Sequence, residues 1–485
     1  MAIDTTQTGK AQSVGGRFQV GFASVEREYP EPVDLWVEGA LPDWIEGSVV
    51  RTGPARFEVG ARTVSHWFDG LALLDRFAID GGRVTYASRM LESGAYRSAS
   101  KTDEISYSEF ATDPCRSLFK RFASAFSPKI TDNANVNVAP DGHNWLAMTE
   151  TPLQIEFDPA TLETVGVRDY DDRMKAHATT AHPHHDAEGG ELMSYTIAYG
   201  PVSRYQLYRR RDGSSTRERY ASATSREPSY MHSFALTPRY AILTEQPLRV
   251  NPLKLLLSGR PFIENFRWQP DLGTRFLVFD RGDGRHVGTY EAEPFFVFHH
   301  VNAFERDGGL VVDLCGYDDA EIVQAFYLER LRNGQAPPIP HFRRYRIDLS
   351  GGRPAEREFE LEVPFELSRI DYRRRNGRDY RFAWGTSLRG EGSGWFDQLA
   401  KIDVTSGDVR IWSAEGCHPG EPILIRRPGG EAEDDGVILS VVLDAANERS
   451  FLAVLDAATM EELARAEAPT RLPFGFHGQF ARGLT

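Results

Sequence analysis

The sequence predicts an all-β protein, and a seven-bladed β-propeller is the favoured architecture. Three observations support this prediction: a strand-and-turn segment that recurs along the chain, the spacing of its copies, and a shortage of amphipathic helical patterns. A chain of 485 residues would ordinarily suggest about three domains. A propeller remains one domain at this length, because each blade buries its faces against its neighbours.

The recurring segment consists of an apolar residue, any residue, an apolar residue, an aspartate and then turn residues. Each copy alternates as a half-buried strand does and then ends in turn chemistry. The six aspartates are Asp80, Asp158, Asp280, Asp348, Asp403 and Asp456. A degenerate copy at 205–213 lies inside the longest interval. Seven hairpin units at intervals of roughly 50–80 residues indicate a propeller, with unrelated hairpins in a β-sandwich as the alternative.

Helical patterns are confined to two stretches, 113–129 and 251–259. The first places apolar residues on one helical face beside Arg and Lys, and the second is the leucine-rich NPLKLLLSG. Two interpretations are open: the stretches cover the propeller core, or they form apolar patches that bind a membrane surface beside cationic residues. Three of the seven lysines lie in these stretches, which favours the membrane.

Composition excludes several classes of protein. The net charge of −14 argues against a nucleic-acid binder, whose binding surface is basic. The hydrophobic content of 41% is enough for a large core. Three scattered cysteines, Cys115, Cys315 and Cys417, are too few for a disulfide framework or a thiolate metal site. No apolar run approaches 18 residues, so no membrane span is expected.

The N-terminal residues 1–16 have neither an apolar core nor a cleavage pattern, so they are interpreted as a disordered tail and not a signal peptide. We therefore expect two regions, the tail 1–16 and a single β-propeller domain over 17–485. The expected location is cytoplasmic, with peripheral attachment to a membrane through 113–129 and 251–259.

Histidines in four aromatic-rich, strand-like segments predict a metal site. The candidates are His182, His184, His185, His232, His299, His300 and His477. A lone histidine in such a segment is usually a hydrogen-bonded core residue, but the inner strands of a propeller converge on one axis and can bring distant residues together. Neutral imidazole suits Fe, Zn, Cu and Ni. A metal held only by imidazoles keeps its full positive charge, because the ligands add no negative charge.

Carboxylates that support such a site are also expected, because a metal-bound histidine normally donates its other N–H to a carboxylate or carbonyl. Glu150, Glu366 and Glu421 lie in apolar strands and are candidates, although each alone would more often be a surface residue. The sequence has no G-x-S-x-G, Walker A or H-E-x-x-H motif. The glycine-rich GEGSG at 390–394 has no helical pattern after it and is not expected to bind phosphate.

The histidine segments and several other blocks resemble the carotenoid cleavage oxygenase family, in family order and over nearly the whole chain after residue 16. The blocks are HWFDGLALL, ITDNANVNV, TETPLQIEFDPATLET, TAHPHHD, SYMHSFALT, FHHVNAFE, EDDGVILSVV and PFGFHGQF. DPCRSLFKRF and ITDNANVNV are most similar to the animal branch, which contains the β-carotene oxygenases and the retinal pigment epithelium isomerohydrolase.

The resemblance implies a seven-bladed β-propeller with a helical and loop cap over the metal-bearing face. It implies one non-haem Fe(II) ion held by four histidines: His182, His232, His299 and His477. His184, His185 and His300 fall on positions that are not ligands. Glu150, Glu366 and Glu421 match the glutamates behind the ligands, although the Glu366 block reads ELSRIDY, with Ser where the family often has Pro. The two helical stretches match the membrane-facing patch.

The activity implied is cleavage of a conjugated C=C bond of a carotenoid or apocarotenoid by O2, giving aldehydes. Central 15,15′ cleavage of β-carotene to retinal is the favoured reaction, and eccentric cleavage is an alternative. Cleavage of stilbene-type phenols is a second, with Tyr96 and Lys101 as the nearest candidates to hold the phenol. Ester isomerohydrolysis and a non-catalytic, lipid-binding metal propeller complete the alternatives. No motif reports the oligomeric state.

Overall fold

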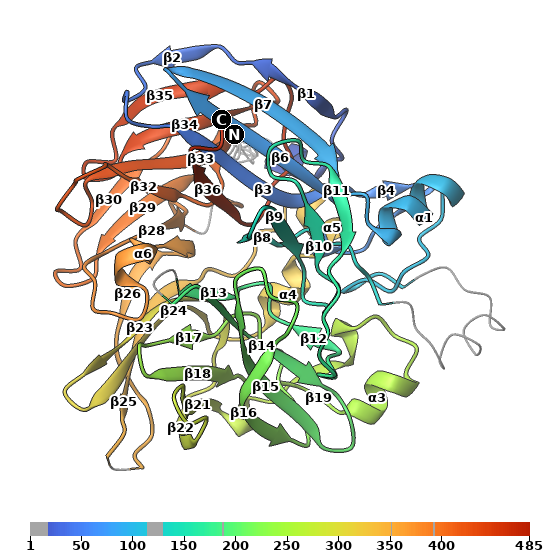
Figure 1. Cartoon of the computed structure of the whole chain (residues 1–485), viewed down its shortest axis with the longest axis vertical. Coiled ribbons are helices and arrows are strands. Elements are labelled where there is room, and N and C mark those ends of the chain that lie inside the picture. The colour runs from blue at the N-terminus through green and yellow to red at the C-terminus, as the bar shows by residue number, and fades with distance from the viewer. Residues whose placement is uncertain (1–17, 114–129, 187–188, 351, 391–392) are drawn as a thin grey trace, which may run out of the picture.

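A computed structural model describes residues 18–485 except 114–129, 187–188, 351 and 391–392. In this part of the chain, seven antiparallel sheets follow one another around a central axis, as the colour sequence in Figure 1 shows. The structure is a seven-bladed β-propeller, which confirms the predicted fold class and excludes the β-sandwich. The division between a tail at 1–16 and a domain from residue 17 stays a prediction, since residues 1–17 lie outside the described residues.

The first four blades use the N-terminal half of the chain together with its last strand. Blade 1 contains β1 (Tyr29–Asp34), β7 (Arg83–Met90), β6 (Leu71–Asp80), β3 (Gly47–Arg56) and β36 (Gly478–Arg482). Blade 2 contains β11 (Thr164–Val167), β10 (Ile155–Phe157), β9 (Asn144–Met148) and β8 (Asn137–Asp141). Blade 3 contains β12 (Ala178–Thr179), β13 (His184–Asp186), β14 (Glu191–Ala198), β15 (Ser203–Arg211) and β16 (Glu218–Ser225). Blade 4 contains β17 (Ala235–Leu236), β18 (Tyr240–Glu245), β21 (Thr274–Asp280) and β22 (His286–Ala292).

The other three blades follow in chain order, apart from one N-terminal strand. Blade 5 contains β23 (Phe296–Arg306), β24 (Gly309–Tyr317), β25 (His341–Asp348) and β26 (Glu356–Pro364). Blade 6 contains β27 (Glu366–Arg369), β28 (Phe382–Ser387), β29 (Gln398–Asp403) and β30 (Val409–Trp412). Blade 7 contains β31 (Cys417–Pro419), β32 (Ile423–Arg426), β33 (Gly436–Asp444), β34 (Arg449–Asp456), β35 (Glu462–Glu467) and β2 (Val37–Gly39).

The repeated aspartates mark the turn into the outer part of a blade. Asp280, Asp403 and Asp456 are the last residues of β21, β29 and β34. Each of their side chains accepts backbone N–H groups two and three residues further on. This local hydrogen bonding stabilises the turn. The outer strands β22 and β30, which follow Asp280 and Asp403, are the most exposed strands of their blades.

The ring is closed at two seams. The C-terminal strand β36 pairs with β3 of blade 1, with Val50 opposite Gln479. The N-terminal strand β2 pairs with β35 of blade 7, with Val37 opposite Ala466. Segments from opposite ends of the sequence therefore complete the first and last blades, and β36 places its neighbouring residues close to the central axis.

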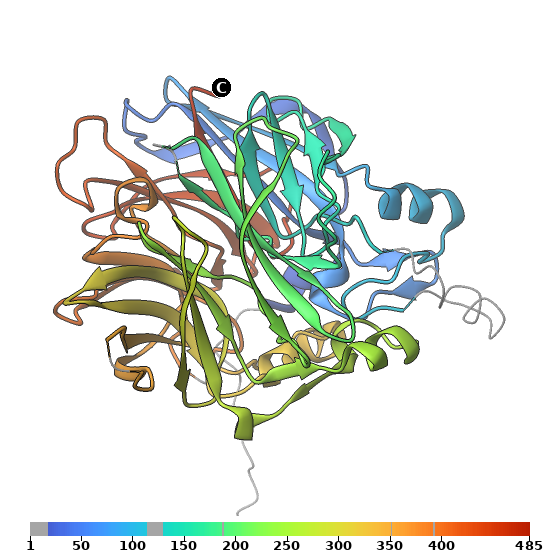
Figure 2. The ribbon, with the colours of Figure 1, turned by 60° about the horizontal axis from the view of Figure 1, so that its bottom comes forward.

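Helices and loops cover one side of the ring, where Figure 2 shows the helices together. The α-helices there are α1 (Gly94–Thr102), α3 (Pro252–Leu257), α4 (Glu321–Ala325) and α5 (Leu328–Arg332). The 3-10 helices are η1 (Phe18–Phe22), η2 (Trp67–Asp69), η3 (Ile263–Asn265) and η4 (Pro270–Leu272). Two short two-stranded sheets accompany them, β4 (Glu58–Val59) with β5 (Arg62–Thr63) and β19 (Leu248–Val250) with β20 (Phe266–Trp268). A further helix, α6 (Tyr372–Arg375), follows β27.

The predicted helix at 251–259 is present as α3. Asn251 caps it by accepting from the backbone N–H groups of Leu253 and Lys254. Leu253 and Leu257 are exposed by 58% and 80%, so they do not cover the core. The stretch 113–129 lies almost entirely outside the described residues, as does Cys115. Cys315 and Cys417 are buried free thiols.

Candidate metal centre

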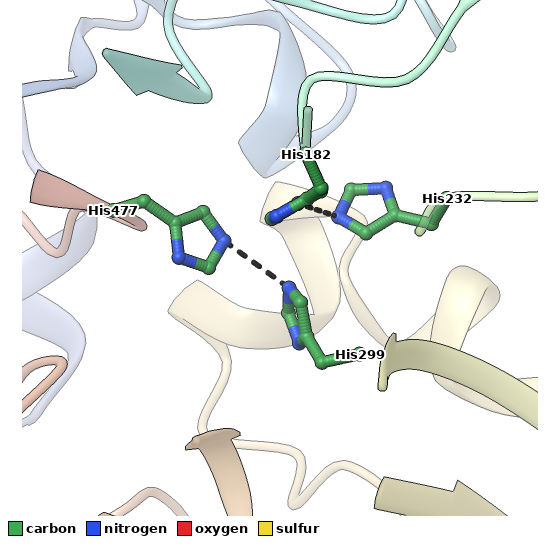
Figure 3. Close-up of side chains that lie close together, drawn as sticks. All are labelled: His182, His232, His299 and His477. Carbon is green, nitrogen blue, oxygen red and sulfur yellow. Dashed lines mark hydrogen bonds between the residues drawn. The ribbon is translucent and has the colours of Figure 1, made fainter. Parts of the chain in front are cut away.

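Four histidine side chains from four different blades meet near the propeller axis. His182 follows β12, His232 precedes β17, His299 lies in β23 and His477 directly precedes β36. One ring nitrogen of each lies within 4.8 Å of the corresponding atoms of the other three. The Nε2 atoms of His182 and His232 are 2.9 Å apart, and those of His299 and His477 are 3.1 Å apart (Figure 3).

Three of the four rings are fixed from behind by the glutamates expected from the sequence. The Nδ1–H groups of His232, His299 and His477 donate to Glu150, Glu366 and Glu421 at 2.7, 2.6 and 2.7 Å. Because an ionised carboxylate only accepts hydrogen bonds, each Nδ1 carries the proton and each Nε2 keeps its lone pair. The lone pairs converge on one point, and the donor set therefore fits a cation.

The three glutamates have different further partners. Glu150 accepts from the Tyr230 hydroxyl at 2.9 Å. Glu366 accepts from the backbone N–H of Leu367 and, at 3.4 Å, from the Tyr317 hydroxyl. Glu421 binds Arg369 through two hydrogen bonds of 2.8 and 2.9 Å and accepts from the Gly478 backbone N–H at 3.0 Å. Only Glu421 among the three is thus paired with a guanidinium.

His182 differs from the other three. Its backbone N–H donates to the Thr180 hydroxyl at 2.9 Å. Its ring contacts the imidazoles of His232, His299 and His477, with centroids 4.5 to 5.0 Å away. The set is therefore composed of three imidazoles held by carboxylates and one held by its neighbours.

Burial lowers the pKa of three of the four imidazoles, those of His182, His232 and His477. Desolvation lowers the pKa of His182 well below its ordinary value, and it lowers the pKa of His477 to about 4 against the opposing effect of Glu421. Burial also lowers the pKa of His232, partly offset by Glu150. Burial raises the pKa of Glu421, but Arg369 and His477 outweigh it and lower that pKa to about 2. These three imidazoles are therefore neutral near pH 7, and the carboxylate behind His477 is ionised.

The other three candidate histidines are directed elsewhere. Both ring nitrogens of His184 are engaged, by the Tyr372 hydroxyl and the Phe234 carbonyl at 2.9 Å each. Those of His300 meet the hydroxyls of Ser233 and Thr244 at 2.8 and 2.7 Å. His185 pairs with Asp212 at 2.9 Å. The structure therefore does not bring these rings to the central point.

An apolar cavity adjoins the metal centre, and sequence reasoning did not identify its walls. It is lined by His232, His299 and His477 together with aromatic side chains, chiefly Trp67, Phe68, Phe298, Phe326 and Phe476. Phe298 and Phe476 directly precede His299 and His477, so their position next to a predicted ligand could have identified them. Trp67 and Phe68 lie in the HWFDG block, which had already been noted for its resemblance to the family. Tyr230, two residues before His232, was also missed, although period-two alternation places it on the same side of the chain.

The candidates proposed for a phenolic substrate do not lie at this cavity. Tyr96 is half-buried in α1 and packs against the apolar cluster that contains Trp67 and Phe326. Lys101 is exposed in the last turn of that helix. Neither residue lines the cavity beside the histidines. None of the helices in the described part of the chain has the length and apolar character that a membrane-spanning segment needs.

Comparison with known proteins agrees with this geometry. The profile of the family described as retinal pigment epithelial membrane protein matches residues 22–482. The chain belongs to this family, the carotenoid oxygenases. The mitochondrial carotenoid-cleaving dioxygenase of Mustela putorius furo is 35% identical, over 93% of this chain and 94% of its own. The carotenoid isomerooxygenase of Galleria mellonella is 34% identical, over 95% and 96%.

Solved structures of the family give the same result for the fold. A variant of the Synechocystis apocarotenoid oxygenase superposes with a TM-score of 0.87 at 26% identity, over 97% of this chain and 100% of that one. The cobalt-substituted form of that enzyme gives 0.86 at 26%, over 96% and 98%. This carotenoid oxygenase family member is thus an oxygenase with the family propeller and a four-histidine cluster at its centre.

Proposed function

We propose that the protein is a non-haem Fe(II) dioxygenase that cleaves a conjugated C=C bond of a carotenoid or apocarotenoid to give two aldehydes. The observation that carries the proposal is the convergence of four imidazoles on one point beside an apolar, aromatic cavity. His182, His232, His299 and His477 would hold the ion, and Glu150, Glu366 and Glu421 would fix three of the rings. Imidazole is a suitable donor for iron.

The reaction balances without protons. One O2 and one C=C bond give two C=O groups, so each oxygen atom enters one product and no acid or base is consumed. Fe(II) supplies the electron exchange that the reaction of O2 with a closed-shell polyene requires. The chain's own contribution is to hold the polyene beside the histidines and to exclude water.

The side chains around the cavity suit that role. Trp67, Phe68 and Phe298 give apolar surface that packs against a polyene, and aromatic rings bury large areas. The polar groups near the metal centre are already engaged in hydrogen bonds, as in Tyr230 with Glu150. The names of the curated relatives, a carotenoid-cleaving dioxygenase and a carotenoid isomerooxygenase, favour cleavage over ester isomerohydrolysis.

For the substrate we propose β-carotene, with central 15,15′ cleavage to retinal. The carotenoid-cleaving, isomerooxygenase and apocarotenoid names of the relatives support an apolar polyene as the substrate class. Eccentric cleavage is the alternative within that class. Lys101 is exposed and is not among the residues that line the cavity, which counts against a phenolic stilbene.

We also propose that the protein is cytoplasmic and attaches peripherally to a membrane. The support is α3, where the exposed Leu253 and Leu257 flank the exposed Lys254. Apolar side chains beside a cation favour the interface of an anionic bilayer. Such a position would let a water-insoluble polyene enter from the bilayer. A Leu257→Ser variant should bind anionic vesicles more weakly in a sedimentation assay, with Val409→Ser, at an exposed apolar residue of the outer strand β30, as the matched control.

The test is aerobic incubation of the Fe(II)-loaded protein with β-carotene in detergent, with products identified by chromatography and mass spectrometry. Retinal alone, carrying one atom from labelled O2 in each molecule, is the expected result. Two unequal aldehydes would move the cleavage site. Turnover of a hydroxystilbene but not of any carotenoid would overturn the proposed substrate class. Product formation without O2 would overturn the dioxygenase reaction.

A further inference from the structure

The charged side chains around the metal centre do not balance one another. A buried carboxylate elsewhere shows the usual arrangement: Asp313 pairs with Arg344 through two hydrogen bonds of 2.7 Å. Among the described residues, the three glutamates behind the histidines have one guanidinium between them, that of Arg369 on Glu421. Three negative charges and one positive charge leave a formal charge of −2 around the four rings.

The hydrogen bonds of the three carboxylates are those of ionised groups. Their partners are groups that can donate: imidazole Nδ1–H, tyrosine hydroxyl, backbone N–H and guanidinium. An ionised carboxylate only accepts, whereas the guanidinium of an arginine keeps its charge at any pH at which the chain is folded. The side chains of Glu366 and Glu421 are 4% and 5% exposed, and that of Arg369 is 19% exposed. The charges are therefore held largely out of water.

Arg369 acts on the donor rings as well as on its carboxylate. It donates to the backbone carbonyl of Gly478 at 2.6 Å, directly after His477. Burial and the neighbouring imidazoles lower the pKa of His182, and the charge of Arg369 lowers that pKa further. Burial lowers the pKa of His477 to about 4; Glu421 opposes this shift, and Arg369 adds to it. The guanidinium is therefore close enough to these two rings to oppose a further positive charge beside them.

We propose that Arg369 sets the charge of this buried centre so that it favours a divalent ion over a trivalent one. A dication brings the formal charge from −2 to zero, whereas a trication leaves one positive charge buried. A net charge held out of water is unfavourable, so buried charges are paired or coordinate metals. Without Arg369 the three carboxylates would instead match a trication. The inference rests on the metal site of the proposed function and not on its substrate.

For iron, the consequence is resistance to oxidation in air. When no substrate is bound, Fe(II) can lose one electron to O2, which becomes superoxide. The resulting Fe(III) has one more positive charge, so the guanidinium of Arg369 opposes this loss. The positioning of Glu421 by the same side chain is a separate effect, because it depends on hydrogen-bond geometry and not on the charge alone.

Two redox-inert ions, Zn(II) and Ga(III), test the proposal without turnover. The affinity of each for the metal-free protein is measured in competition with nitrilotriacetate, and the ratio of the two affinities cancels effects common to both ions. Arg369→Gln should lower the preference for Zn(II) on the order of tenfold, the effect of one unit charge on another at about 10 Å in a protein. Arg369→Lys keeps the charge and should stay near the wild-type ratio. Arg381→Gln, which removes a guanidinium from Asp403 in the same blade, is the matched control and should change nothing.

Two further measurements remain informative if Arg369→Gln binds Ga(III) poorly or folds poorly. Glu150→Gln removes a negative charge and should shift the ratio in the opposite direction, towards Zn(II). In the iron-loaded protein, redox mediators hold the solution at one potential, and electron paramagnetic resonance measures the Fe(III) present. The Fe(III)-to-Fe(II) ratio should be higher in Arg369→Gln than in the wild type by the same factor as the change in ion preference.

The outcomes separate this inference from the proposed function. An unchanged ion preference in both Arg369→Gln and Glu150→Gln would overturn the role of charge. An equal loss of preference in Arg369→Gln and Arg369→Lys would assign the effect to geometry and would also overturn it. If the wild type binds Zn(II) but cleaves no polyene, the proposed function fails, while the ion ratios still decide the role of Arg369. A wild type whose binding of both ions is unaffected by His299→Ala would overturn the metal site and this inference together.

Discussion

The chain contains two groups of histidines that are neighbours in sequence but differ in chemistry. His182 and His184 are two residues apart, and His299 and His300 are adjacent. In the metal centre, His299 gives one nitrogen to Glu366 and directs the other to the common point (Figure 3). In the second group, His184 and His300 use both nitrogens on carbonyl or hydroxyl oxygens. A histidine is available to a metal only where one nitrogen keeps a free lone pair.

The pKa values of the imidazoles do not distinguish the two groups. Burial lowers the pKa of His300 to about 3 and that of His184 to about 4, and His477 in the metal centre also has a pKa of about 4. All of them are neutral near pH 7. The difference therefore lies in the tautomer and direction of each ring, which its partner sets.

The largest expected effect is the difference in metal content and activity between variants of His299 and of His300. His299→Ala removes a nitrogen from the convergent set, so metal content and activity should fall by more than the roughly 100-fold seen for changes to outer partners. His300→Ala should keep metal and activity but lower the free energy of unfolding by about 1–3 kcal/mol, because buried hydroxyls lose a partner. Elemental analysis and denaturant unfolding measure the two effects. Retention of metal in His299→Ala, with loss in His300→Ala, would reverse the assignment.

The next effect concerns the carboxylates. Glu366→Gln replaces an acceptor of the His299 Nδ1–H by a neutral amide, so metal affinity should fall by about 10–100-fold. Competition with a chelator of known affinity measures it. Glu305→Gln, which changes a carboxylate bonded to Thr237 away from the site, is the control and should leave the affinity unchanged. Equal affinities in the two variants would show that the carboxylate does not support the metal.

A smaller effect is expected at Arg369. Arg369→Gln removes the guanidinium from Glu421, but that carboxylate still accepts from the Gly478 N–H, so metal affinity should fall by only about tenfold. Arg369→Lys keeps a charge without the paired hydrogen bonds and should restore part of the loss. Visible absorption of the Co(II)-loaded variants reports the geometry around His477 directly. A spectrum and affinity identical to the wild type would show that Arg369 serves blade packing alone.

The smallest effect is on the dependence of stability on pH. The folded chain keeps His300 neutral down to a pKa of about 3, whereas the unfolded chain binds a proton near pH 6.5. Between these values the unfolded state holds more protons, so the free energy of unfolding falls as the pH falls, by at most about 1.4 kcal/mol per pH unit for each such group. His300→Gln should flatten the curve by this amount in the metal-free protein.

The comparison of variant with wild type is needed because other groups act in the opposite direction. Burial raises the pKa of Asp69 to about 7, so this carboxyl contributes stability that is lost as the pH rises towards 7. Only the difference between the two curves isolates His300. An identical slope for His300→Gln and wild type in the metal-free protein would contradict the prediction.

Much of the fold followed from local chemistry. The aspartates that end β21, β29 and β34 bind their own turns, so the hairpins were readable without knowledge of the rest of the chain. The contacts between residues of different blades could not be predicted in the same way. The paired hydrogen bonds of Arg369 with Glu421 join blades 6 and 7, and they exist only once the ring has closed. The positive φ of Leu367 likewise has no sequence pattern of its own.

The residues of the site were predicted from the resemblance of sequence blocks to the family more than from the spacing of residues. The four convergent histidines and the three glutamates behind three of them were predicted, and the structure brings all of them together. The aromatic walls were not predicted, because Trp67 and Phe476 are 409 residues apart in sequence yet 4.3 Å apart between ring centroids. Contacts of that separation depend on the whole topology. Tyr96 and Lys101, the candidates for binding a phenol, lie in the helix α1 and are not among the residues that line the cavity.

The closing strand β36 has a mechanical consequence. His477 directly precedes it, so the seam between β36 and β3 cannot open without drawing one donor away from the other three. An ion shared by the four rings would stabilise the closed ring by mass action, since it binds the closed form and not the open one. The supply of that metal would then affect the lifetime of the protein as well as its chemistry. Without the metal the ring would be looser, and the C-terminal strand would become more accessible to proteases.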